Sequence, residues 1–187
     1  MSPSSSSAAH EGTATTAVIS LGSNLGARER SVLQGARAVA TIDGVGAARL
    51  SSLYETEPVG AGYSRPFVNA VVVLEAWIDP MALLEACLGI ERAAGRKPGG
   101  GDRLLDIDIV LFGDLRSQAP RLVLPHPRMR ERLFVLAPLA ELAPGMRLPP
   151  DGVTTAEAAA RLGNSPGVRR ISSRSIVAAR AFPPVRD

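Results

Sequence analysis

Asp106 and Asp108 are the residues whose type and spacing most directly suggest chemistry. They lie in the segment 103–113, RLLDIDIVLFG, which is rich in Ile and Val, ends in a Gly-Asp turn signal and is typical of a β-strand. Strict alternation assigns its side chains to two faces, with Ile107, Ile109 and Leu111 on one and Asp106, Asp108, Val110 and Phe112 on the other. The two carboxylates therefore point the same way, with their Cα atoms about 7 Å apart.

Like charges at this distance repel each other, and a cation between them removes the conflict. Carboxylate oxygens suit hard ions such as Mg²⁺. Two such ions about 3.5–4 Å apart can clamp a phosphoryl group during its transfer. The pair thus favours a metal site for phosphate chemistry; the alternative is a polar strand end whose acids only face water.

Arginine dominates the positive charge of the chain, and Lys97 is its single lysine. The formal net charge is +3 and the isoelectric point is about 9.7. Arginine binds phosphate with two parallel hydrogen bonds, so this composition favours an anionic ligand, although an arginine-rich genome gives the same bias. A nucleic acid is not expected as a partner, because aromatic residues make up only 4% of the chain and no nucleic-acid-binding motif is present. Several arginines surround His126, opposed only by Glu131: Arg121, Arg128, Arg130 and Arg132.

Phe67 and Asn69 lie two residues apart in an apolar segment, so they share one face of a strand. A ring for stacking beside an amide for hydrogen bonding suits a flat heterocycle with polar edges. A core phenylalanine beside a satisfied asparagine is the alternative. Glu91 ends a helical stripe that contains Leu84 and Leu88, which places its carboxylate either at the edge of the core or in a site.

The length of 187 residues and the hydrophobic content of 45% indicate one domain with a proper core, plus tails. Because Cys87 is the single cysteine, no intramolecular disulfide is possible and a reducing compartment is allowed. No apolar run approaches the roughly 20 residues of a membrane helix. The serine-rich N-terminus lacks the basic start and apolar stretch of a secretory signal. We expect a cytoplasmic monomer without a membrane attachment.

Hydrophobic periodicity and turn signals predict the element order βαββαβ. The expected strands are 17–21, 45–54, 67–76 and 105–112, and the expected helices are 28–42 and 80–94. This order is typical of an α+β, ferredoxin-like sandwich, a four-stranded sheet with its helices on one face. Additional short C-terminal helices are expected at 127–133 and 137–142. We divide the chain into a disordered N-terminal tail (1–15), a main domain (16–165) and a basic C-terminal tail (166–187) that is partly helical.

Several short motifs occur in the order, and at nearly the spacing, of one enzyme family. They are AVISLGSNLG (17–26), YETEPVG (54–60), RPFVNA (65–70), LDID (105–108) and LPHPRMRERLF (124–134). From about Val18 to Gly152 the chain resembles 6-hydroxymethyl-7,8-dihydropterin pyrophosphokinase, an enzyme of folate biosynthesis. The resemblance implies that residues 16–165 are a pyrophosphokinase domain. With two Mg²⁺ ions it would transfer pyrophosphate from ATP to the hydroxymethyl pterin, giving AMP and the pterin diphosphate.

The resemblance also implies individual roles. The catalytic residues would be Arg96, Arg103, Asp106, Asp108 and Arg132, with Asp106 and Asp108 as the metal ligands. The pterin-binding residues would be Thr56, Pro58, Val59, Phe67, Asn69 and Phe134, with the two phenylalanines sandwiching the ring. The ATP-binding residues would be Glu91, Lys97, Ile109, Arg121, His126 and Arg132.

The segment 97–102, KPGGGD, is shorter than the loop that the resembled family usually has there, and it lacks that loop's tryptophan. This difference keeps a second interpretation open, a pterin-binding paralogue with weakened catalysis. A third is a ferredoxin-like nucleic-acid-binding module, which is less favoured because the strands offer few aromatic residues for base stacking.

Overall fold

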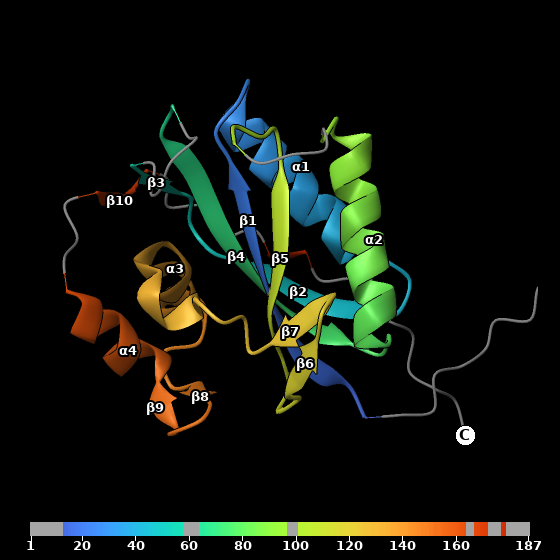
Figure 1. Cartoon of the computed structure of the whole chain (residues 1–187), viewed down its shortest axis with the longest axis vertical. Coiled ribbons are helices and arrows are strands. Elements are labelled where there is room, and N and C mark those ends of the chain that lie inside the picture. The colour runs from blue at the N-terminus through green and yellow to red at the C-terminus, as the bar shows by residue number, and fades with distance from the viewer. Residues whose placement is uncertain (1–12, 58–63, 97–100, 164–166, 172–176, 179–187) are drawn as a thin grey trace, which may run out of the picture.

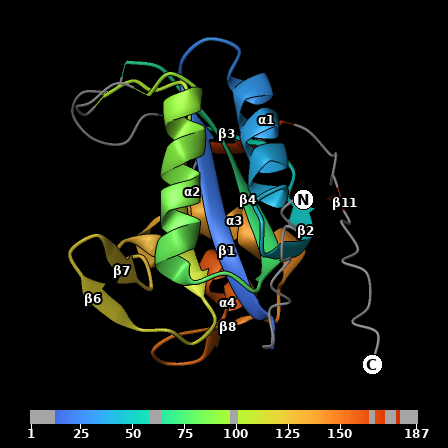
Figure 2. The same cartoon turned by 90° about the vertical axis from the view of Figure 1, so that its right-hand side faces the viewer.

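The computed structural model describes residues 13–57, 64–96, 101–163 and 167–171 with their side chains, and the backbone of 177–178. This part of the chain forms three layers (Figures 1 and 2), in which α1 and α2 cover one face of an antiparallel sheet and α3 and α4 lie on the other side. The mixed α/β class expected from the sequence is confirmed. The main elements are β1 (Thr15–Ser23), α1 (Arg28–Ala40), β2 (Val45–Leu50), β3 (Tyr54–Thr56), β4 (Phe67–Ala76), α2 (Pro80–Ala93), β5 (Asp106–Phe112), α3 (Leu133–Leu142) and α4 (Thr155–Leu162).

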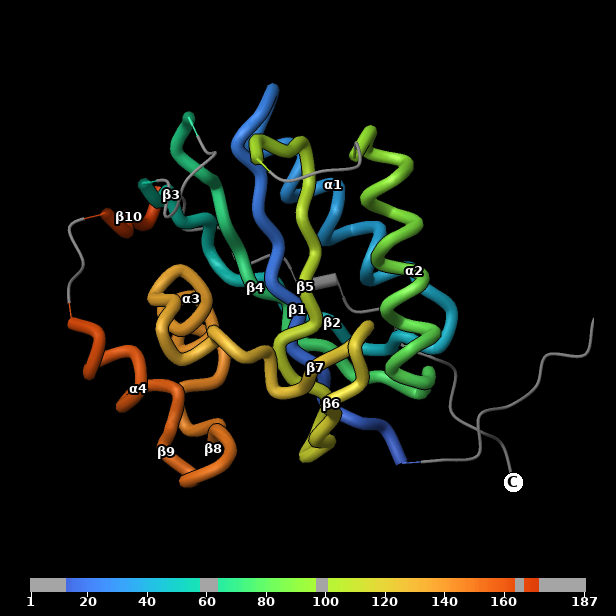
Figure 3. The backbone as a smooth tube through the Cα atoms, viewed as in Figure 1, coloured from blue at the N-terminus to red at the C-terminus, as the bar shows by residue number. Residues whose placement is uncertain are grey.

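β1 lies inside the sheet, between β4 and the edge strand β5 (Figure 3). It pairs antiparallel with β4 from Thr15, opposite Ala76, to Ser23, opposite Val68, and it pairs antiparallel with β5 on its other side. β2 and β3 pair with different parts of the far edge of β4. Two short C-terminal strands, β10 (Val168–Arg170) and β11 (Val177–Ala178), extend the sheet by pairing with β3 and β2.

The strand predicted for 45–54 is divided in two, because side chains at 51–53 bond outside the strand ladder. Ser52 donates its amide and its hydroxyl to Oε1 of Glu141 on α3, at 3.1 and 2.8 Å. The Tyr54 hydroxyl donates to Oε2 of the same carboxylate at 2.9 Å. Burial, together with this carboxylate, raises the pKa of Tyr54 to about 12. Glu141 thus ties the break between β2 and β3 to the helix on that face.

Apolar side chains fill the space on both faces of the sheet. Under α1 and α2, Val32, Val39 and Leu83 have no exposed surface. Under α3, Leu136 and Leu139 are equally buried. α2 begins as its sequence predicts: the Asp79 side chain accepts the amides of Met81 and Ala82 at 2.8 and 3.3 Å, and Pro80 follows as the first helical residue. Among the described residues, no helix combines the length and apolarity needed to cross a membrane.

One expectation about β5 is wrong. Ile109 lies opposite Ile19 and Leu111 lies opposite Val18, so Val110 has no partner in β1 and forms a β-bulge. The extra residue reverses the alternation beyond it. Leu111 therefore packs toward α3, and Phe112 packs toward α1 and α2, the opposite of the predicted faces.

The C-terminal third differs most from the expectation. The predicted helix at 127–133 is a 3-10 turn, η1 (Met129–Glu131), and α3 begins at Leu133, four residues before the predicted helix at 137–142, which it covers. Within the expected C-terminal tail, residues 168–170 form a strand. Two hairpins were not predicted: β6 (Ser117–Ala119) with β7 (Leu122–Leu124), and β8 (Arg147–Leu148) with β9 (Val153–Thr154). The N-terminal residues 1–12 of the expected tail lie outside the described part, and β1 already begins at Thr15.

Candidate active site

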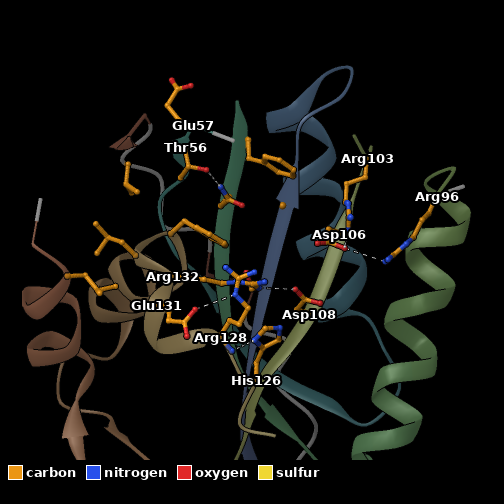
Figure 4. A pocket seen from close by; sticks show the side chains of 18 residues that line it. Thr56, Glu57, Arg96, Arg103, Asp106, Asp108, His126, Arg128, Glu131 and Arg132 are labelled. Atoms are coloured by element: carbon orange, nitrogen blue, oxygen red, sulfur yellow. Dashed lines mark hydrogen bonds and ion pairs between the residues drawn. The ribbon is translucent and has the colours of Figure 1, made fainter. Parts of the chain in front are cut away.

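A cleft of about 560 Å³ opens on the face of the sheet that carries α3 (Figure 4). Its lining comes from β1, β3, β4 and β5, from the segment before α3 and the first turn of that helix, and from α4 and β10. Segments that are distant in the sequence therefore meet here.

Asp106 and Asp108 both line the cleft, as strand alternation predicts. Oδ1 of Asp106 accepts hydrogen bonds from Nη1 of Arg103 at 2.6 Å and from Nη1 of Arg96 at 3.3 Å. Oδ2 of Asp108 lies 3.7 Å from Nη1 of Arg132. Arginines from the end of α2, from the start of β5 and from the segment before α3 thus converge on the two carboxylates.

The electrostatics of the cleft leave Asp108 poorly compensated. Burial raises the pKa of Asp108, the charge of Asp106 raises it further, and His126, Arg132 and Arg103 partly offset this. Burial lowers the pKa of His126, as do the nearby Arg132 and Arg128, against the attraction of Asp108. An additional cation would relieve the repulsion between the carboxylates, and the arginines suit phosphate oxygens.

The carboxylate pair fits divalent ions only as part of a larger set of ligands. Within the described ranges, no group of three or more His, Cys, Asp or Glu side chains is arranged to hold a metal ion. Mg²⁺ commonly takes one or two carboxylates and completes its coordination with water and substrate phosphates. The donors present at Asp106 and Asp108 match that pattern.

A second part of the cleft suits a flat polar ring. Nδ2 of Asn69 donates to Oγ1 of Thr56 at 2.8 Å, and both side chains are nearly buried. Phe67 lines the cleft on the same face of β4 as Asn69, and Phe134 lines it from the first turn of α3. The Arg132 guanidinium lies over the Phe134 ring, 5.6 Å from its centroid. These side chains supply two aromatic rings and a polar edge.

Gly22 and Asn24, both in the motif at 17–26, shape the cleft although no role was predicted for them. A Cβ atom at Gly22 would lie 2.9 Å from Oδ1 of Asn69, so only glycine allows this amide to approach β1. Oδ1 of Asn24 accepts the amide of Arg103 at 2.7 Å, and its Nδ2 donates to Asp102 at 2.6 Å. In the sequence, the only indication of these two roles is the presence of Gly22 and Asn24 at the turn after the first strand. Glu57, whose backbone the resemblance gives as a pterin contact together with that of Thr56, also lines the cleft. Further lining residues to which no individual role was assigned are Ser20, Arg128, Glu131, Leu133, Leu162 and Val168.

Glu91 does not line the cleft, although the sequence predicts an ATP contact for it. Its side chain has no exposed surface. Oε1 accepts the Ile107 amide at 2.8 Å and a hydrogen bond from Arg96. Oε2 is buried without a hydrogen-bond partner among the described residues. The carboxylate therefore holds together the end of α2 and the strand segment between the two aspartates.

Two more predicted ATP contacts lie elsewhere. The Ile109 side chain is buried in the core under α1 and α2. Arg121 is 62% exposed and pairs with Glu85 of α2. Three further predicted residues lie outside the described part of the chain: Pro58, Val59 and Lys97.

The sequence that forms this cleft matches a known protein family. The family model described as 7,8-dihydro-6-hydroxymethylpterin-pyrophosphokinase (HPPK) matches residues 18–144. The chain belongs to the HPPK family. All the motifs that carried the resemblance lie within this match or begin one residue before it, so the predicted family is confirmed.

Curated relatives agree with this assignment. The 2-amino-4-hydroxy-6-hydroxymethyldihydropteridine pyrophosphokinase of Methylorubrum extorquens AM1 is 38% identical over 159 residues, which cover 84% of this chain and 99% of that protein. The protein of the same name from Bacillus subtilis 168 is 42% identical over 128 residues, which cover 67% of this chain and 77% of that one.

The fold also matches solved HPPK-DHPS structures. A Plasmodium falciparum HPPK-DHPS A437G structure aligns with a TM-score of 0.68 at 15% identity, over 89% of this chain and 51% of that one. This chain spans about half the length of that solved chain. At this identity the likeness shows a common fold alone.

Proposed function

We propose that this chain transfers pyrophosphate from ATP to 6-hydroxymethyl-7,8-dihydropterin, giving AMP and the pterin diphosphate in folate biosynthesis. Membership of the HPPK family supports this reaction. The observation that carries the proposal is a single cleft that joins a ring-stacking pocket to a carboxylate pair flanked by arginines (Figure 4).

The pterin would lie between Phe67 and Phe134, with its polar edge toward Asn69 and Thr56. Offset stacking on two rings supplies apolar contact and fixes the plane of the ligand. The buried amide and hydroxyl then orient the ring within that plane, because an unmatched heterocycle would leave them unpaired. Contacts from Pro58 and Val59 belong to the same proposal.

The nucleotide phosphates would lie over Asp106 and Asp108. Mg²⁺ ions bound there would neutralise phosphate charge and hold the triphosphate in line for transfer. Arg96, Arg103 and Arg132 would stabilise the charge on the transferred group, and His126 would support the leaving side. The hydroxymethyl oxygen would attack the β-phosphorus and lose its proton to solvent, while the bond from that phosphorus to the bridging oxygen breaks and AMP departs with that oxygen. Positioning and electrostatics would supply most of the rate in such a reaction.

The remaining assignments are proposals of the same kind. The strand order β5-β1-β4, with β2 and β3 beyond β4 and with α1 and α2 on one face, supports a ferredoxin-like core. ATP contacts from Glu91, Lys97, Ile109 and Arg121 are retained on the resemblance alone. So are a monomeric state, a cytoplasmic location and the absence of a nucleic-acid partner.

The test is AMP formation from Mg-ATP with and without the hydroxymethyl pterin. We expect AMP only when both substrates are present. Calorimetry should show that Phe67→Ala and Asn69→Ala weaken pterin binding and leave binding of a non-hydrolysable ATP analogue unchanged. Tight pterin binding without AMP formation would favour the weakened paralogue, and binding of single-stranded RNA alone would favour the nucleic-acid module. The family match favours neither alternative.

A further inference from the structure

β10 brings a C-terminal side chain into the pterin part of the cleft. Val168 lies opposite Thr56 of β3, and Thr56 lies opposite Phe67 of β4, so the three form one row across three strands. All three line the cleft. Neighbouring strands lie about 4.8 Å apart, which puts the Cα atom of Val168 roughly 10 Å from that of Phe67. A ring stacked on Phe67 and bonded beside Thr56 extends toward Val168.

Several contacts fix β10 against β3. The Glu57 amide donates to the Gly167 carbonyl at 3.0 Å, and the Ile171 amide donates to the Leu53 carbonyl at 2.9 Å. On the face away from the cleft, Arg169 pairs with Glu55 at 2.6 Å. Because the strand is held at both ends and through a side chain, the Val168 side chain has a defined place.

Leu162 reaches the same cleft from the last turn of α4. It is 37% exposed, and Leu115 is the other exposed large hydrophobic residue in the part of the chain that the structure describes. A capping box between Thr154 and Glu157 fixes the start of α4, and the helix packs against α3, which carries Phe134. An apolar side chain left open to a ligand cleft gains most when a ligand covers it.

We propose that Val168 and Leu162 form an apolar end wall of the pterin subsite, which contacts the bound ring and excludes water from the Thr56–Asn69 hydrogen-bonding edge. The inference rests on the proposed function and names specificity residues for it. Neither residue lies in the segment 18–144 that the family model matches. Excluding water from polar contacts strengthens them, and contact with apolar side chains adds affinity for the ring.

The test compares Val168→Thr and Leu162→Ser with two controls outside the cleft, Val123→Thr in β7 and Leu115→Ser. Val168→Thr keeps the branched shape that suits a strand and adds only polarity, so β10 should remain in place. We expect the KM for the pterin to rise about three- to tenfold in each wall variant, as the loss of one or two apolar contacts predicts. The KM for Mg-ATP, and calorimetric binding of an ATP analogue, should not change. Val168→Ile, which keeps an apolar branched side chain at this position, should bind the pterin as well as the wild type does.

The experiments distinguish an error in the inference about Val168 and Leu162 from an error in the proposed reaction. If the wild type forms no AMP but binds the pterin, calorimetry with the pterin still tests the wall. Unchanged pterin affinity in both folded wall variants overturns the inference. An equal loss of affinity for pterin and ATP analogue, or the same loss in the control variants, also overturns it, because a wall of the pterin subsite acts on one ligand only.

Discussion

Asp106 and Asp108 share a strand face but have different neighbours. Asp106 accepts two arginine hydrogen bonds, whereas Arg132 lies 3.7 Å from Asp108. Asp108 is also the carboxylate whose pKa is raised by burial and by its neighbour. We infer that an added cation would help to keep Asp108 ionised.

The first prediction concerns this carboxylate. Asp108→Asn should lower turnover about 100-fold or more, because an amide would hold Mg²⁺ less well than a carboxylate at the place where the ion would neutralise phosphate charge. The fold should stay intact, since the substitution relieves repulsion with Asp106. Steady-state AMP formation and thermal unfolding measure the two effects. Asp114→Asn, in an exposed turn, is the control; wild-type turnover in folded Asp108→Asn would exclude the metal-ligand role.

A second prediction concerns the close approach at Gly22. In Gly22→Ala the new methyl group meets the Asn69 amide oxygen at 2.9 Å, so the amide must move. We expect pterin affinity to fall about tenfold, equivalent to about 1.4 kcal/mol, with no change in ATP-analogue binding. Gly89→Ala on α2 is the matched control, because a Cβ atom there meets its nearest neighbour only at 3.8 Å. Normal pterin binding by Gly22→Ala would show that Asn69 does not orient the ring.

The elements that the sequence predicted correctly, such as β4 and α2, are those determined by residues within or next to the element itself. β4 has the predicted bounds 67–76, because a continuous apolar run with loop residues before it can only be a buried strand. α2 follows its capping residue and proline in the same way. The α4 helix was missed despite the capping box at Thr154 and Glu157, a signal that was present in the sequence.

Other features depend on residues that are distant in the chain. The interruption at Ser52 needs Glu141, which lies 89 residues later. β10 has the sequence Val-Arg-Arg, which reads as a solvated tail until Glu55 pairs with Arg169, 114 residues away. The same limit applies to the site: shared strand faces brought Asp106 and Asp108 into the cleft, whereas only the folded chain shows Leu162 and Val168 there.

A third prediction concerns the ion pairs that join β3 to β10 and α1. The Arg169 and Arg28 guanidinium groups hold the pKa of Glu55 below its ordinary value of 4.5. A carboxyl group whose pKa is lower in the folded than in the unfolded state stabilises the fold at any pH above its unfolded-state pKa. This contribution is lost as the pH falls through the folded-state pKa. Glu55→Gln should therefore lose about 0.5 kcal/mol of stability at pH 7, since Arg169 is largely exposed.

Urea unfolding of the wild type and of Glu55→Gln at pH 7, 5 and 3.5 measures this dependence. The difference between the two proteins should shrink toward pH 3.5. Glu75→Gln, at an exposed position of β4, should show no such trend. A constant difference at every pH would mean that the charge of Glu55 does not support β10.

In the molecule as a whole, the sheet separates two apolar layers, and these layers differ in their relation to the cleft. The layer under α1 and α2 contains Leu83, and the layer under α3 contains Leu136, both without exposed surface. α3 also presents Phe134 to the cleft. Packing in the second layer is therefore coupled to the pterin pocket, and packing in the first layer is not.

The fourth prediction separates these layers. Leu83→Ala and Leu136→Ala should each cost about 2–5 kcal/mol of unfolding free energy, because each leaves a cavity in a close-packed layer. Only Leu136→Ala should also weaken pterin binding, measured by calorimetry at a temperature where both variants are folded. Equal pterin affinities in the two variants would show that α3 does not set the position of Phe134.

The bulge at Val110 divides β5 into two stretches with different structural roles. Before the bulge, regular strand alternation points the carboxylates of Asp106 and Asp108 into the cleft. Beyond the bulge, Leu111 and Phe112 are core residues, and their size must fit the apolar layer that each one fills. Mutations can therefore accumulate at the far end of the strand, and be compensated by repacking, without turning either aspartate out of the cleft.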